Sequence, residues 1–326
     1  MRICGFFQTT QKFWAIAFAT TLFANVFGCN EISAKRDLGN YEYVFSLGRE
    51  GVGKGEFKYV EDMAISASGN LYVTDALNSN VQVFSPSGEY LATVCGRNAD
   101  QGGLQKPEGI AIAPDGSIFV ADYLTGKIHK YSSDHKLQLS FSEFGTEEGQ
   151  NAESEFMQIC KNGLLYMAEA GNNRADVFDQ SGVFQFSFGE AGSLPGQFLR
   201  PEAAKCDSTG RVFVADLGNH RVQVFDSKGK YLRMMGSKGT APGQFLKPAG
   251  LAFDASDNLY VSELAGARVQ KFNPAGEVIA IWGEEGSGPG QFGNLHGILV
   301  GPDGSVYVAD TANHRVQVFR MASARR

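Results

Sequence analysis

Short apolar stretches alternate with turn-forming polar clusters along most of the chain. In one clear copy of this pattern the apolar stretches cover residues 203–206, 212–215, 221–225 and 231–235. Clusters such as residues 207–210 and 226–229 separate them and end in glycine, which permits the positive φ of a tight hairpin. Stretches of four to six residues rich in Val, Ile, Phe and Tyr predict β-strands arranged as an antiparallel meander.

The same four-strand unit returns at a fixed interval. The acidic residue that ends the second strand recurs every 47 residues, at Asp75, Asp122, Glu169, Asp216, Glu263 and Asp310. A fixed period of 20–50 residues indicates a repeat architecture. A four-stranded sheet with apolar residues on both faces has to pack between neighbours of the same kind. Six copies therefore predict an all-β fold, a six-bladed β-propeller of four-stranded antiparallel blades over residues 41–320.

The two ends of the repeat array predict how the ring closes. The sixth unit has its third strand at residues 315–319 and is then followed only by a short tail, residues 321–326. An additional strand-like stretch, residues 43–48, precedes the first unit. We expect this N-terminal strand to complete the last blade, because that arrangement leaves no open edge on the ring.

Residues 1–29 differ in kind from the repeats. Arg2 and Lys12 precede any acidic residue, and a 15-residue apolar run follows at residues 13–27. This length suits the core of a signal peptide and is short for a membrane span. We therefore expect a signal peptide over residues 1–29 and export from the cytoplasm.

The apolar run ends in Val26-Phe27-Gly28-Cys29, which resembles a bacterial lipobox. The resemblance implies lipidation of Cys29, anchoring at a membrane, and a tether over residues 30–40 that leads to the propeller. Cleavage after Ala34 and an uncleaved anchor are the alternatives. The expected location is periplasmic or at the cell surface.

Charge and cysteine content narrow the classes of function. A formal net charge of −6 argues against a nucleic-acid partner, since phosphates require a basic surface. Beyond Cys29 the chain carries Cys95, Cys160 and Cys206, an odd number without paired spacing. This pattern predicts that a disulfide framework is absent.

The recurring motifs Gly-Gln-Phe, Tyr-Val-Ala-Asp and Asn-His-Arg-Val-Gln-Val-Phe resemble those of the NHL-repeat family, in its bacterial exported or lipoprotein form. The fourth and sixth units match best. The third departs most, with Asn151, Ser154 and Ala175 at motif positions. The resemblance implies an interaction platform, although a few members are enzymes, such as the peptidylglycine amidating lyase. Cys/His zinc patterns do not precede the repeats.

One position of the repeat is unequal around the ring. Directly after the usual proline, at the start of the first strand, the six units carry Glu61, Glu108, Glu155, Glu202, Ala249 and His296. First strands line the channel of a propeller, so these residues should encircle one of its mouths. Carboxylates on neighbouring blades around this mouth repel each other by about 2 kcal/mol per pair. This repulsion raises the pKa of some of them or recruits a cation.

These residues are our candidate ligand-binding site. It could take an amine-bearing ligand or a divalent cation, Ca²⁺ or Zn²⁺, with His296 as the nitrogen ligand. The alternative is structural, with each carboxylate paired to a nearby basic residue, Lys106, Arg200 or Lys247.

Other recurring polar residues predict structure. Acid and Arg or Lys recur five residues apart across the turn between second and third strands, as in Asp216 and Arg221, which predicts a repeated ion pair. His220 and His314 belong to the turn motif, and His129 falls inside a third strand. The sequence carries no nucleophile elbow, P-loop or His-Glu-x-x-His motif.

The sequence favours an exported, non-catalytic scaffold that binds a protein, peptide or glycan at the cell envelope through the loops around the channel mouth. The alternative is a metal-dependent lyase or hydrolase with its site at that mouth, because propellers host both kinds of function.

Overall fold

The computed structural model describes residues 41–96 and 103–322. The expected signal peptide, the lipidation site Cys29 and the tether over residues 30–40 lie outside these residues, as do residues 323–326 of the tail. None of the helices within the described ranges combines the length and apolarity that crossing a membrane requires.

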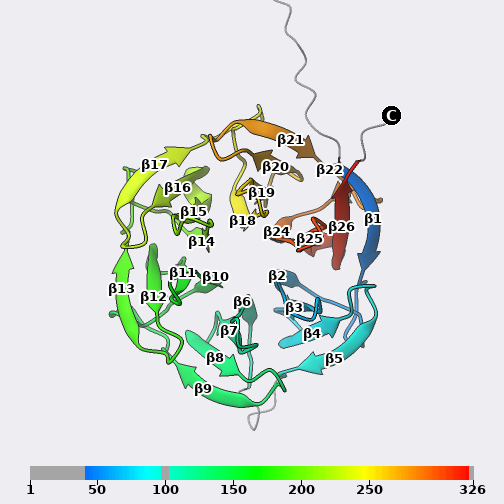
Figure 1. The fold of residues 1–326 in the computed structure, drawn as a ribbon, viewed down its shortest axis with the longest axis horizontal. Helices are drawn as coiled ribbons and strands as arrows, with labels where there is room; N and C mark the ends of the chain where they lie inside the picture. Colours follow the sequence, from blue (N-terminus) through cyan, green and yellow to red (C-terminus); the bar gives the residue numbers. More distant parts are fainter. Residues whose placement is uncertain (1–40, 97–102, 323–326) are drawn as a thin grey trace, which may run out of the picture. The chain divides into compact units, whose positions relative to one another are not determined.

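The described chain forms six four-stranded blades around a central channel (Figure 1). Blades 1 to 3 consist of β2 (Val60–Ile65), β3 (Leu71–Asp75), β4 (Asn80–Phe84), β5 (Tyr90–Val94); β6 (Pro107–Ile112), β7 (Ile118–Asp122), β8 (Lys127–Tyr131), β9 (Leu137–Phe141); and β10 (Ser154–Ile159), β11 (Leu165–Glu169), β12 (Arg174–Phe178), β13 (Phe184–Phe188).

Blades 4 to 6 repeat this arrangement. They consist of β14 (Pro201–Cys206), β15 (Val212–Asp216), β16 (Arg221–Phe225), β17 (Tyr231–Met235); β18 (Pro248–Phe253), β19 (Leu259–Glu263), β20 (Val269–Phe272), β21 (Val278–Trp282); and β24 (Leu295–Val300), β25 (Val306–Asp310), β26 (Arg315–Met321) with β1 (Tyr41–Leu47). The remaining elements are β22 (Glu284–Glu285), β23 (Gln291–Phe292) and two short 3₁₀ turns, η2 (Leu217–Asn219) and η3 (Thr311–Asn313).

The first strand of each blade lies next to the channel and the fourth lies at the rim (Figure 1). The predicted six-bladed, all-β fold is confirmed. The strands expected in the fourth unit differ from the observed ones only by one or two residues at their ends. Blades 3 and 4 are also joined to each other, because β10 and β14 form a parallel bridge at Phe156 and Ala203.

The last blade closes as expected. β1 pairs with β26 in antiparallel register, from Tyr41 opposite Met321 to Leu47 opposite Val316. Tyr41 also stacks on Trp282 of blade 5, with ring centroids 4.1 Å apart. The first described strand therefore joins the last one and packs against the preceding blade, which leaves no open ring edge.

The core consists of apolar side chains packed between adjacent blades. Phe57, Phe198, Phe245 and Phe292 occupy equivalent positions in four units, and each is fully buried. The glycine that ends the preceding strand makes room for this ring: a Cβ on Gly189, at φ +92°, would lie 2.3 Å from the Phe198 ring. Large buried aromatic rings of this kind supply much of the burial energy in these four units.

The acid–arginine pattern is confirmed as a structural brace in three blades. The Arg221 Nε lies 2.7 Å from Asp216 Oδ2, and the same pair forms between Arg268 and Glu263 and between Arg315 and Asp310. The Arg221 guanidinium also donates to the carbonyls of the Gly-Gln-Phe loop, for example Gln197 at 2.8 Å. Because this brace recurs by symmetry, it holds loops and carries no specific chemistry.

Blade 3 uses the same residues differently. Arg174 pairs with Asp176 at 2.9 Å, while Glu169 accepts backbone N–H groups, including that of Glu153 at 2.7 Å. Among the histidines, His129 bonds to the Ser140 hydroxyl at 2.8 Å inside its sheet, as expected for a packing residue.

The expectation that cysteines would remain unpaired is wrong for one pair. Cys160 and Cys206 form a disulfide between blades 3 and 4, while Cys95 is a buried free thiol. The two partners are separated by 46 residues, one short of the repeat, because Cys160 directly follows β10 whereas Cys206 is the last residue of β14. The sequence did not reveal this cross-link between neighbouring repeats, because the two cysteines do not occupy equivalent repeat positions.

Candidate functional site

All five candidate residues line one cavity at the mouth of the channel where the first strands begin, here called the acidic mouth. Its volume is about 400 Å³. The five side chains are buried, with exposed fractions of 3% to 8%: Glu61, Glu108, Glu155, Glu202 and His296. Each is the second residue of its first strand, and Ala249 holds the equivalent place on β18.

A β-bulge places these side chains. In each of the six blades the register between first and second strands shifts at the start of the first strand, for instance between Val60 and Met63 around Glu61. A bulge bends a strand and re-aims its side chains, and it is common beside functional sites. The repeated bulge thus turns one residue per blade toward the same mouth.

Basic neighbours compensate only part of this acidity. Lys106 Nζ lies 2.5 Å from Glu108 Oε1 and 3.7 Å from the centre of the Tyr123 ring. Arg200 pairs instead with Glu153, at 2.7 Å. Within the described ranges, Glu155 and Glu202 have no ion pair with a basic side chain, and Lys247 has none with any acid. The structural alternative is therefore realised for Glu108 and not for the set as a whole.

Burial and mutual repulsion keep protons on these carboxyls. Burial raises the pKa of Glu61 and of Glu155 well above its usual range, and the neighbouring carboxylates raise it further. Burial, with the charge of Glu108, raises the pKa of Glu202 to about 8. Burial raises the pKa of Glu108 as well, although Glu155 and Lys106 offset part of this rise. The raised pKa values thus favour the protonated forms of these carboxyls at neutral pH.

His296 is neutral in this setting. The Thr311 hydroxyl donates to the Val60 carbonyl at 2.6 Å, so it accepts the bond from His296 Nδ1 at 2.9 Å. The lone pair of Nε2 is left facing the carboxyl of Glu61, 3.8 Å away. Burial, reinforced by the charge of Lys106, lowers the pKa of His296 to about 4.

Across residues 41–96 and 103–322, no three His, Cys, Asp or Glu side chains lie close enough together to share a metal ion. The carboxyls line the wall of the mouth and do not meet at one point. Metal binding at this set remains a prediction.

Some residues of the mouth were not singled out from the sequence. Tyr123, Leu217, Leu264 and Thr311 all follow the acid that ends a second strand, and the first three line the cavity while Thr311 holds His296. This position is as variable between blades as the glutamate position. Its variability was the signal available in the sequence.

The comparisons with known families agree with the fold. An NHL-repeat family model matches residues 292–319, and the model of a 6-bladed β-propeller family matches residues 204–276. The chain is a six-bladed β-propeller. Its matched segments are similar to an NHL repeat and to this propeller family. No curated protein matches it in sequence.

Solved structures share the fold at low identity. A protein of unknown function from Bacteroides thetaiotaomicron superposes with a TM-score of 0.69 at 14% identity, over 87% of this chain and 76% of that one. An auxiliary nutrient binding protein from the same organism gives 0.64 at 14%, over 86% and 75%. Virginiamycin B lyase from Staphylococcus aureus gives 0.59 at 14%, over 89% and 97%. At these identities the likeness shows the fold alone.

Proposed function

We propose that this chain is a binding propeller whose acidic mouth receives a cationic group, an ammonium or a guanidinium, carried by a peptide or protein partner. The observation that carries the proposal is the set of four buried carboxyls in one cavity of about 400 Å³, of which only Glu108 has a cationic partner in the described structure. Buried acids that lack counter-ions are what a bound cation would complete.

The protonation of the mouth links such binding to pH. A cation entering beside Glu155 and Glu202 favours their ionised forms, so it displaces the protons that burial holds there. The carboxylates then accept charge-assisted hydrogen bonds from the ligand. The rings of Tyr59 and Tyr123 line the same cavity, and the Lys106 ammonium already lies over the Tyr123 ring, an arrangement that shows how the mouth accommodates a cation.

The loops around the mouth favour a macromolecular partner over a free amine. Leu199, which also lines the cavity, is 46% exposed. Leu124 and Leu194, in neighbouring loops at the same end of the strands, are 54% and 65% exposed. Exposed apolar side chains around a polar depression suit a peptide or protein surface, and loops on a rigid scaffold commonly carry such contacts.

We place this activity outside the cytoplasm, at the cell envelope, with a lipid on Cys29 as the anchor. The support is the apolar run and the lipobox-like motif of the sequence. Replacing Cys29 by Ala should release the protein from the membrane fraction. Unchanged membrane association of Cys29→Ala would refute lipidation at that residue.

Calorimetric titration with two matched probes tests the binding site. Nα-acetyl-lysine amide carries an ammonium, whereas its Nε-acetylated form does not. We expect only the first to bind saturably, more tightly at pH 8 than at pH 6, with release of protons. Glu155→Gln and Glu202→Gln should each weaken it about tenfold, the scale of a lost charge-assisted hydrogen bond.

Glu89→Gln is the matched control, since Glu89 is an exposed surface carboxylate remote from the channel. It should bind the probe as the unmodified protein does. Equal binding of both probes, or unchanged affinity in both mouth variants, would contradict the proposal.

A further inference from the structure

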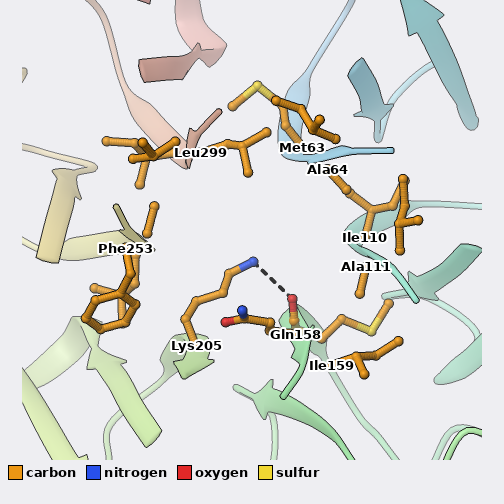
Figure 2. Close-up of a pocket in the computed structure, with 16 residues that line it drawn as sticks. Met63, Ala64, Ile110, Ala111, Gln158, Ile159, Lys205, Phe253 and Leu299 are labelled. Carbon is orange, nitrogen blue, oxygen red and sulfur yellow. Dashed lines mark hydrogen bonds between the residues drawn. The ribbon is translucent and has the colours of Figure 1, made fainter. Parts of the chain in front are cut away.

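The opposite end of the channel holds a second pocket, here called the apolar mouth. It has a volume of about 260 Å³ and is lined by the last three residues of most first strands (Figure 2). Its wall is mainly aliphatic, with Met63, Ile110, Ile159, Phe253 and Leu299 among its members. A small concave pocket with apolar walls and a few convergent polar groups has the general form of a ligand site.

Lys205 is the single charged residue of this lining. Four equivalent positions in the other blades hold Ala64, Ala111, Ala252 and Leu299, so the repeat itself does not call for a lysine there. The side chain is only 9% exposed and reaches from the wall toward the middle of the ring (Figure 2).

The ammonium of Lys205 can still donate a hydrogen bond to a ligand. It donates to the Met157 carbonyl at 3.0 Å and lies 3.3 Å from Asp62 Oδ2, a carboxylate of the blade opposite across the channel. Charge-assisted N–H···O bonds usually measure about 2.7–2.9 Å, so the contact with Asp62 is a loose one. The third N–H has no partner within the described residues.

Gln158 adds a second donor. Its Oε1 accepts the backbone N–H of Cys206 at 2.8 Å, which fixes the orientation of the amide. In the described part of the chain its NH₂ group has no partner, and both Gln158 and Lys205 extend into the pocket (Figure 2). The side chains that line the apolar mouth therefore offer hydrogen-bond donors, whereas the unpaired acceptor Asp62 Oδ1 lies outside the lining.

We propose that the apolar mouth binds a small carboxylate with an apolar body, such as a branched-chain or aromatic carboxylic acid. The carboxylate accepts from Lys205 and Gln158, and the body packs against the aliphatic wall. At about 30 Å³ for each water-sized group, the cavity has room for about nine such groups. A hydrocarbon would leave the buried ammonium donor unsatisfied, and a cation would be repelled by the like charge of Lys205.

Titration with phenylacetate and 4-methylpentanoate, each beside its neutral amide, tests the inference. We expect saturable shifts of the ¹³C-methyl NMR signals of Met63 and Met157 with the carboxylates, and about tenfold weaker binding of the amides. Absence of a saturable shift with both carboxylates at millimolar concentration, or equal binding of acid and amide, would overturn the proposal.

Variants locate the binding groups. Lys205→Met should weaken phenylacetate at least about tenfold, and Gln158→Leu should weaken it less. Lys271→Met is the matched control, because Lys271 is also buried and ion-paired, with Asp254 at 3.1 Å, but lies outside the pocket. Unchanged affinity in Lys205→Met, or an equal loss in Lys271→Met, would contradict the assignment.

Lys205→Met leaves Asp62 without its cation. If this variant fails to fold, Asp62→Leu with Lys205→Met removes both charges and provides the same test of affinity. The comparison of acid with amide on the unmodified protein needs no variant at all.

Discussion

The two mouths of the channel are built from the same six strands and have opposite chemistry. The second residue of four first strands supplies a carboxyl to the acidic mouth, and the last three residues of most first strands supply mainly aliphatic side chains to the apolar mouth. The Asp62–Lys205 contact joins β2 and β14, strands of opposite blades, across the channel. The difference teaches that the repeat builds the scaffold, whereas chemistry enters where equivalent positions are unequal.

The largest effect on stability should come from breaking the Asp62–Lys205 contact, which lies between the two mouths. Asp62→Ala leaves Lys205 buried without its anionic partner, so we expect a loss of about 3–5 kcal/mol in the free energy of unfolding. Urea unfolding measures this, and combining the change with Lys205→Met should recover much of the loss. A loss below about 1 kcal/mol would show that the contact contributes little.

The next effect concerns the disulfide beside the apolar mouth. Replacing Cys160 and Cys206 by Ser removes the cross-link between blades 3 and 4, which should cost about 2–4 kcal/mol in the free energy of unfolding. Reductant should lower the free energy of unfolding of the unmodified protein to that of the variant, and it should leave the stability of the variant unchanged. We also expect weaker carboxylate binding at the apolar mouth with unchanged amine binding at the acidic mouth. The reverse pattern would contradict the assignment of the two sites.

A smaller effect distinguishes the acidic mouth by its pH dependence. The folded-state pKa of Glu202, about 8, exceeds its unfolded value, so the folded state binds the extra proton and stability falls as pH rises toward 8. One titrating group contributes up to about 1.4 kcal/mol per pH unit.

Glu202→Gln should flatten this slope, as measured by the unfolding midpoint between pH 6.5 and pH 8. His296, whose pKa is lowered to about 4, acts in the opposite direction only as pH falls below its unfolded value. Glu89→Gln should keep the slope of the unmodified protein. An unchanged slope in Glu202→Gln would mean that Glu202 does not retain its proton.

The smallest effect should follow the addition of Ca²⁺ or Zn²⁺. His296 Nδ1 is engaged by Thr311, and the described residues hold no three metal-ligating groups together. We expect the melting temperature to shift by less than about 1 °C in both the unmodified protein and His296→Ala, since a bound ligand would raise it. Stoichiometric metal in the purified protein that is lost in His296→Ala would favour the metal-dependent lyase or hydrolase.

Much of the fold could be predicted because the repeat supplies an internal alignment. The period of 47 residues gave the blades, the missing strand after residue 319 gave the closure by β1, and the unequal glutamate position gave the acidic mouth. The bulge that turns Glu61 and its equivalents inward could not be predicted, because it depends on register between strands.

Contacts that cross the ring escape the same alignment. Asp62 and Lys205 are 143 residues apart, two more than three repeat periods, so no comparison of equivalent positions brings them together. Their meeting depends on the diameter of the closed channel. The donors of the apolar mouth are a different case, because Lys205 and Gln158 occupy equivalent repeat positions 47 residues apart. Two polar residues at an otherwise apolar position were a signal available in the sequence.

The strand that completes the last blade also constrains the order of assembly. β1 at residues 41–47 pairs with β26 at residues 315–321, so a nascent chain cannot finish its ring until β26 has been synthesised. Contacts between residues so distant in sequence form slowly. Until then β1 lacks its partner strand, so the growing chain presents an unpaired strand to its surroundings. The strand that closes the edge of the finished propeller is thus exposed and unpaired while the chain is being made.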